Sequence, residues 1–280
     1  MIRTRTMEKS WRCLGAVFLA IQLCPAMDAF PAAARTNRLA AQMNRLDALV
    51  RAYPDFLAGH DRSTLEWSDG SRMRVSDGNR SKTFHERLRS ASIADQLRLT
   101  YPKGRRSKKP ARGSDPGRFR NTAFFDKMYG DCTKGETQRN LVKITWLAKL
   151  GGGDAAVTSV NGVAERLKDV SAELERMPRL RRFLLPSAGT FNCRTVKDTG
   201  QRSMHAWGAA IDINTRYADY WLLSGRKRYR NRIPWRIVAV FERHGFIWGG
   251  KWSHFDTMHF EYRPELLRLR GAAKSQAALP

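Results

Sequence analysis

Two short motifs of the sequence carry residues suited to holding a metal ion and moving a proton. Ser-Met-His-Ala-Trp-Gly-Ala-Ala-Ile-Asp is followed later by Asp-Thr-Met-His-Phe-Glu. His205, Asp212 and His259 supply two imidazoles and one carboxylate, and such a set leaves one zinc coordination position open for water. Asp256 lies three residues before His259, close enough to act on that water. The motifs therefore predict one zinc ion per chain, with Asp256 as general base.

Short strands would bring the two motifs together. Side chains alternate between the two faces of a strand, so Asp212 points away from the apolar residues on either side of it. The same rule places His259 and Glu261 on one face. We therefore expect Asp212 and His259 to face one cleft. His205 would enter from the turn before Gly208, where a glycine lets the backbone pass close to the ligand site.

Further residues fit the substrate side of this cleft. Hydrolysis of a peptide requires a cation beside the developing oxyanion. Arg194 is the best candidate, since a bridge from Cys132 to the preceding residue, Cys193, would fix its position. The predicted contacts to substrate are Ser203, Trp207 and Trp252.

The paired motifs resemble the zinc peptidases that include D-alanyl-D-alanine carboxypeptidases and phage L-alanyl-D-glutamate endopeptidases. The resemblance covers residues 186–263 and implies that His205, Asp212 and His259 bind zinc. It also implies that Asp256 is the catalytic base, in the shorter form found among the endopeptidases and their relatives. An upstream arginine of the family contacts substrate, and Arg194 matches it in an altered surrounding sequence.

Several of the histidines, and Asp256, also have simpler structural interpretations. An isolated histidine is more often structural than a metal ligand, and we assign His60, His85 and His244 that role. His254 is interpreted as structural, with contact to substrate as the alternative. Asp256 could instead cap a turn.

The composition is that of a globular protein with an extreme charge. The 280 residues include 42% hydrophobic and 10% aromatic residues, and the net charge is +25. Such a surface attracts polyanions: nucleic acid, anionic lipid or an acidic cell-wall polymer. The segment 226–232 is rich in arginine and is either a solvated loop or a contact for that polymer.

Residues 1–29 have the three-part pattern of a secretory signal peptide. Basic residues precede an apolar run from Cys13 to Cys24, and Ala29 ends a motif suited to cleavage. The run is shorter than the roughly 20 residues that a spanning helix needs. A retained anchor is the alternative, and lipidation at Cys24 is disfavoured because Leu23 stands where a small residue is expected. We predict export to the periplasm or the extracellular space.

Export would place the two cysteines that remain after signal cleavage in an oxidising compartment. Cys132 and Cys193 form an even pair, which predicts one disulfide in an oxidising compartment. It would close a loop of about 60 residues and stabilise the fold by roughly 3–4 kcal/mol. Two buried free thiols are the alternative.

Segments 30–114 and 115–270 differ in character. The first is basic and mostly helical, of unknown role; the second is the predicted peptidase domain, followed by a flexible tail at 271–280. The pattern of the first predicts a helix around 39–50, a hairpin over 64–75, a helix over 84–99 and a basic linker at 103–112. The second has predicted helices over 141–150, 163–174 (with Asn161 as N-cap) and 234–244, and strands over 208–213, 246–248 and 258–262. The fold class is α+β, with a small antiparallel sheet flanked by helices.

These observations give one hypothesis and two competitors. We expect an exported zinc peptidase that cleaves peptidoglycan stem peptides as a D,D-carboxypeptidase or an L,D-type endopeptidase. Its expected partners are the stem peptide and anionic cell-wall polymer. We expect it to be monomeric, to bind no nucleic acid, and to have no stable membrane span after cleavage. A cell-wall-binding protein that keeps the zinc fold without catalysis is the first competitor. A nucleic-acid-binding protein is the second, and only charge supports it.

Overall fold

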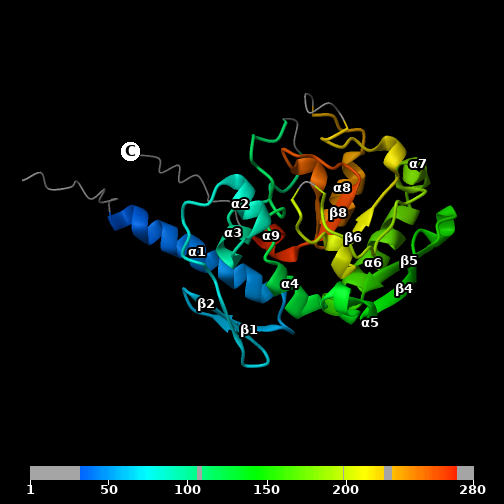
Figure 1. Cartoon of the computed structure of the whole chain (residues 1–280). Helices are drawn as coiled ribbons and strands as arrows, with labels where there is room; N and C mark the ends of the chain where they lie inside the picture. Colours follow the sequence, from blue (N-terminus) through cyan, green and yellow to red (C-terminus); the bar gives the residue numbers. More distant parts are fainter. Residues whose placement is uncertain (1–31, 106–108, 198, 224–228, 270–280) are drawn as a thin grey trace, which may run out of the picture.

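The computed structural model describes residues 32–105, 109–197, 199–223 and 229–269 (Figure 1). The predicted signal peptide and the predicted C-terminal tail lie outside the described residues, and the basic segment 226–232 is described only in part. None of the described helices is both long and apolar enough to cross a membrane.

The described chain is an α+β fold with small antiparallel sheets. Its helices are α1 (Ala32–Ala52), α2 (Phe84–Arg89), α3 (Ile93–Gln96), α4 (Thr122–Tyr129), α5 (Glu136–Arg139), α6 (Val163–Glu175), α7 (Arg181–Leu184), α8 (Trp235–Arg243) and α9 (Pro264–Arg268). Its strands are β1 (Leu57–His60), β2 (Thr64–Trp67), β3 (Arg72–Arg74), β4 (Leu141–Thr145), β5 (Asp154–Thr158), β6 (Ala210–Asp212), β7 (Phe246–Trp248) and β8 (His259–Tyr262). They form the sheets β1-β2-β3, β4-β5 and β6-β8-β7. The predicted fold class is confirmed, although the single predicted sheet is wrong.

The sheet β6-β8-β7 carries both predicted motifs. β8 lies in the middle, and its antiparallel register sets Asp212 of β6 opposite His259. On the other face, Phe260 stacks on Phe241 of α8 with ring centroids 3.9 Å apart. α8 begins just after Pro234 and buries its apolar side against the sheet. One face is thereby anchored in the core, which leaves the opposite face to present polar side chains.

The predicted helix over residues 141–150 is wrong. Residues 141–145 form β4, which pairs in register with β5, and only Ala148–Leu150 make a turn of 3-10 helix. The β-branched residues of β4 favour a strand, because they lose side-chain freedom in a helix. The glycines at 151–153 therefore belong to the β4–β5 connection: a Cβ on Gly152 would lie 1.8 Å from the carbonyl oxygen of Trp146.

Two helix starts differ from the prediction because of local capping. The predicted helix over 84–99 is two helices, since Ser92 and Asp95 form a reciprocal capping box that begins α3. Asn161 does not cap α6: its φ is 56°, and Gly162 occupies the N-cap position. The helices predicted around 39–50 and 234–244 and the hairpin over 64–75 are confirmed as α1, α8 and β2–β3.

The N-terminal region shares one hydrophobic core with the rest of the described chain. That core extends from Leu46 of α1 to Leu269. α1 lies beside α9 (Figure 1), and Tyr53 at its end donates a hydrogen bond to Glu265 of α9 at 2.7 Å. Glu265 in turn accepts from Arg263 at 2.6 Å. The predicted boundary between residues 114 and 115 stays a prediction.

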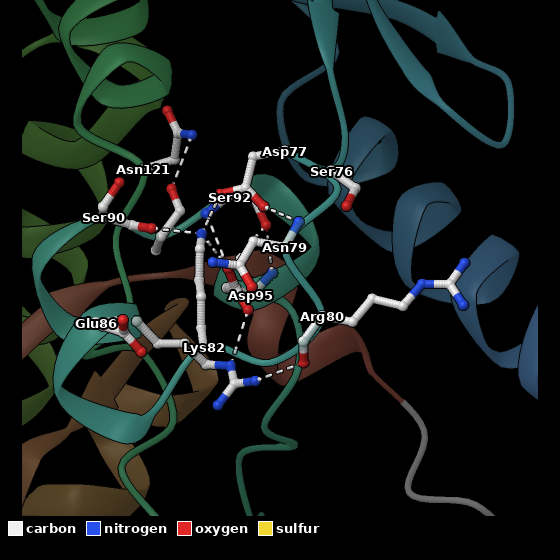
Figure 2. Close-up of polar contacts among 12 residues, drawn as sticks. Ser76, Asp77, Asn79, Arg80, Lys82, Glu86, Ser90, Ser92, Asp95 and Asn121 are labelled. Carbon is white, nitrogen blue, oxygen red and sulfur yellow. Dashed lines mark hydrogen bonds and ion pairs between the residues drawn. The ribbon is translucent and has the colours of Figure 1, made fainter.

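A buried lysine fastens the segment between β3 and α3. The Lys82 side chain is 5% exposed, and its Nζ donates to the Ser90 carbonyl at 2.7 Å and to Asp95 Oδ2 at 3.0 Å. It also pairs with Asp77 (Figure 2). One ammonium thus ties the loop before α2 to the capping residues of α3.

Replacing Lys82 with methionine is expected to lower the free energy of unfolding by about 3 kcal/mol, because Asp95 loses a buried cationic partner. Arg87 still donates to Asp95 at 3.0 Å, which holds the loss near the lower end of such effects. Urea denaturation measures it. Lys143→Met is the matched control: its pair with Asp154 is exposed, and its loss is expected to leave the free energy of unfolding close to that of the wild type. Equal stabilities of the two variants would contradict the role of Lys82.

Candidate metal centre

Three predicted ligand side chains converge in the structure. His205, Asp212 and His259 each offer one donor atom, and these atoms lie within 4.8 Å of one another. His205 Nε2 is 3.2 Å from His259 Nδ1 and 3.2 Å from Asp212 Oδ2, while His259 Nδ1 is 3.0 Å from Asp212 Oδ1. Zinc with ligand bonds of about 2.0–2.2 Å in a tetrahedron needs donors about 3.3 Å apart. The donor set and its spacing therefore fit a zinc ion.

Each ligand is positioned by a different local device. His205 lies in the 3-10 turn Met204–Trp207, whose N-cap Ser203 accepts a hydrogen bond from the His205 backbone N–H. Asp212 and His259 are a directly opposed pair on β6 and β8. Gly208 ends the 3-10 turn with a φ of 65°, and a Cβ there would lie 2.9 Å from the backbone nitrogen of Thr158. Packing against β5 thus accounts for this glycine, whereas we expected close approach to the ligand site.

Hydrogen bonds on the far side of each ring fix which nitrogen faces the metal position. His205 Nδ1 contacts the Thr190 carbonyl, which leaves Nε2 toward Asp212. His259 Nε2 contacts Glu261 Oε2 at 2.9 Å, which leaves Nδ1 as the ligand atom. Arg120 donates to Glu261 at 2.5 Å and holds it in place. Such carboxylate and carbonyl partners orient ligand imidazoles in metal sites.

In the metal-free protein, the surroundings of these residues favour a protonated His259 beside ionised Asp212 and Glu261. Burial lowers the pKa of His259, but its hydrogen bonds to Asp212 and Glu261 raise it to about 10. Burial raises the pKa of Glu261, but the Arg120 charge and the hydrogen bond to His259 lower it to about 2. The pKa of Asp212 is likewise well below its ordinary value, because both histidines outweigh its burial.

Metal binding at pH 7 is therefore expected to release about one proton, since His259 must lose its proton to become a ligand. The apparent affinity should rise about tenfold per pH unit between pH 7 and the His259 pKa, because the competing proton becomes scarcer. Calorimetric zinc titrations in buffers of different ionisation enthalpy measure the number of protons released. Release of no proton would contradict the assignment of His259 Nδ1 as a ligand atom.

Asp256 lies in the same cavity as Asp212 and His259, and one of its carboxylate oxygens accepts no hydrogen bond among the described residues. Within the described part of the chain, its Oδ1 is buried and has no hydrogen-bond partner. Burial and the negative charge of Asp212 raise the pKa of Asp256 to about 7. A carboxylate with an unsatisfied oxygen and a pKa near neutrality is suited to accept and return a proton.

A cavity of about 220 Å³ connects these groups to solvent. It is lined by Asp212, Asp256 and His259 together with Arg118, Arg120, Arg194, Val196, Tyr220, Trp221, Trp252, His254 and Met258. Arg194 is exposed at this cavity, where its sequence position predicted it. The preceding Cys193 forms the predicted disulfide with Cys132, with Cα atoms 5.7 Å apart.

The comparisons agree with this site. Residues 197–262 match the model of a protein family described as D-alanyl-D-alanine carboxypeptidase. The predicted resemblance is confirmed over this segment. The segment contains His205, Asp212, Asp256 and His259, and the match supports a hydrolase of the peptidase class. No curated protein and no solved structure matches the chain.

Two of the predicted substrate contacts, Ser203 and Trp207, do not line this cavity. Trp207 is fully buried: it packs on Phe125 with centroids 5.0 Å apart and donates from Nε1 to Asp126. Ser203 is 3% exposed, and its hydroxyl caps the turn that carries the first ligand. Trp252 does line the cavity, with its ring 5.5 Å from that of His259, although it is 4% exposed and therefore more buried than predicted.

Sequence reasoning missed residues that come from outside the matched segment. Arg118 and Arg120 line the cavity as buried cations on either side of Phe119. In a chain with 51 lysines and arginines, two more arginines give no signal by themselves. Residues 118–120 belong to no strand, so the alternation of side chains along a strand could not have placed these two arginines at the cavity.

Proposed function

We propose that this protein is an exported, zinc-dependent peptidase that hydrolyses a peptide bond in peptidoglycan stem peptides. The observation that carries the proposal is the meeting of His205, Asp212 and His259 beside Asp256, whose Oδ1 is buried and unpaired among the described residues. The family match supports a peptidase that acts on peptidoglycan. The disulfide and the sequence of residues 1–29 support export.

The residues of the site divide the work of amide hydrolysis. His205, Asp212 and His259 would hold the zinc ion through Nε2, a carboxylate oxygen and Nδ1. When bound, zinc supplies Lewis-acid activation of water and of the peptide carbonyl. Asp256 Oδ1 accepts a proton as water attacks the carbonyl carbon, and it returns that proton to the amide nitrogen as the C–N bond breaks. Arg194, at the rim of the same cavity, pairs with the negative charge that develops on the carbonyl oxygen.

The net charge favours a polymer to which the stem peptide is attached. With a net charge of +25, the protein is suited to an anionic polymer in the cell wall, to which stem peptides are attached. We propose the periplasm or the extracellular space as its location, and a monomer as the active form. The scissile bond is either the terminal D-alanyl-D-alanine bond or an L,D bond within the stem.

Product mapping tests this function. Purified protein is incubated with defined muropeptides, with added zinc, with a chelator, and with zinc restored after chelation. Mass spectrometry is expected to show one new product in the zinc arms: loss of a terminal D-alanine for a carboxypeptidase, or two fragments for an endopeptidase. The chelator should abolish it and zinc should restore it. Intact substrates at stoichiometric amounts of zinc-loaded protein would contradict the proposal and favour a wall-binding role.

A further inference from the structure

A larger cavity lies next to the metal centre. It has a volume of about 740 Å³, and its lining includes Phe84, Lys109, Arg112, Trp221, Tyr229 and His254. Trp221 and His254 also line the cavity of the metal centre, so these two side chains form the boundary between the two spaces. A ligand that reaches the metal centre can therefore continue into this second cavity.

Aromatic rings form its wall. The His254 ring stacks on Phe84 with centroids 5.5 Å apart and meets Trp221 edge-on at 4.6 Å. Tyr229 contacts Phe255 at 5.3 Å. Phe84, Trp221, Tyr229 and His254 are only half-buried, so parts of these rings remain exposed. The cavity thus offers aromatic surface to a ligand.

A buried carboxylate fixes the orientation of His254 in this aromatic wall. His254 Nδ1 lies 2.5 Å from Asp115 Oδ2, and the Asp115 side chain is fully buried. Ser253 Oγ donates to the other oxygen of Asp115 at 2.8 Å. With Nδ1 directed to Asp115, the ring has a fixed orientation, which leaves Nε2 to pair with a ligand.

The polar groups of the cavity complement oxygen-rich ligands. Lys109, Arg112 and His85 are exposed cationic or donor groups along it, and its described lining contains no carboxylate. The described lining also contains no residue of a strand. An extended peptide is usually bound by pairing with a strand edge, so this wall is poorly suited to the peptide itself.

We infer that this cavity binds the sugar of the glycan strand to which the stem peptide is attached. A sugar ring presents C–H groups that pack against the negative face of an aromatic ring. Its hydroxyl groups, which both donate and accept, can form a hydrogen bond with His254 Nε2, and its hydroxyl and acetamide oxygens can accept from Lys109 and Arg112. Phe84, Lys109 and Arg112 lie outside the segment that matches the family model, so a region beyond that segment contributes part of this site. The inference rests on the proposed function.

Kinetics with two substrates test the sugar site. The same stem peptide is supplied either attached to its N-acetylglucosaminyl-N-acetylmuramic acid disaccharide or freed from it. For the wild-type protein, kcat/KM is expected to be about tenfold higher for the attached form, through a lower KM. Phe84→Ala and, separately, the exposed Arg112→Gln should bring this ratio toward one. Leu223→Ala is the control, because Leu223 is 86% exposed and does not line the cavity.

A binding experiment separates this inference from the proposed function. The peptide-free disaccharide is titrated into the wild-type protein and into Phe84→Ala, and the heat of binding is measured. If neither peptide is cleaved, the proposed function fails, while binding that Phe84→Ala abolishes still supports the sugar site. A wild-type ratio of one overturns the inference, as does an inactive protein that fails to bind the disaccharide.

Discussion

Replacing Asp256 with asparagine is expected to lower kcat by about a thousandfold while the protein keeps its zinc and its fold. Asparagine has the shape of the carboxylate but cannot accept the proton of the attacking water. The ligands His205, Asp212 and His259 are unchanged, so the metal content should stay at one ion per chain. Steady-state kinetics on the muropeptide that the wild-type protein cleaves, together with metal analysis, measure both quantities.

Stability distinguishes loss of the base from loss of the fold. The pKa of Asp256 is raised from 3.8 to about 7 in the folded protein, so its ionisation lowers the stability of the metal-free protein as the pH rises from about 4 to about 7, and this loss is complete above pH 7. Asp256→Asn removes that ionisation and is therefore expected to be at least as stable as the wild type at pH 8. Asp154→Asn, at an exposed position of β5, is the control and should keep full activity. Wild-type turnover in Asp256→Asn would remove the base assignment.

The same pKa shapes the pH dependence of the reaction. A general base must be ionised, so kcat/KM should fall as the pH drops through the pKa of Asp256. A bound cation favours the carboxylate, and the acidic limb is therefore expected at or below pH 7. In the asparagine variant the residual rate should lose this limb.

Replacing His205 with alanine is expected to weaken zinc binding by more than about 100-fold, because one of three protein ligands is removed and not merely reoriented. The zinc content after dialysis should fall from one ion per chain to near zero, and activity should fall with it. Competition with a chromophoric chelator measures the affinity. His244→Ala is the matched control, since His244 pairs with Glu173 at 3.1 Å at the end of α8.

The outcome for this variant separates two causes of inactivity. Full zinc content in His205→Ala would show that the ion is held elsewhere, which would contradict the site. Loss of zinc with retention of the circular dichroism spectrum would confirm a ligand role. Unfolding would be informative only beside the stability of the metal-free wild-type protein, which is therefore measured in parallel.

The shared face of Asp212 and His259 was predictable because the information for it is local. Alternation along residues 209–213 and 258–262 separates core residues from cleft residues, and the register of β6 and β8 then places Asp212 opposite His259. The disulfide followed from the count of cysteines and an exported compartment. Each inference needed only neighbouring residues or a general rule.

What could not be predicted depends on contacts between distant segments. The β-branched residues at 141–145 favour a strand, but the partner that completes it, β5, is not indicated by the residues of that stretch themselves. Trp207 is buried because Asp126 and Phe125 of α4 meet it from another part of the chain. Likewise, nothing in the local sequence joins Asp115 to His254, although this pair holds the wall of the second cavity.

X-ray absorption spectroscopy at the zinc edge of the purified protein tests the central claim most directly. The predicted result is one zinc ion per chain, with two imidazole nitrogens and a carboxylate oxygen at about 2.0–2.2 Å and no sulfur ligand. His205→Ala should retain almost no zinc after dialysis, whereas Asp256→Asn should give the same ligand spectrum as the wild type. A protein that takes up no zinc, or a spectrum without imidazole ligands, would contradict the account.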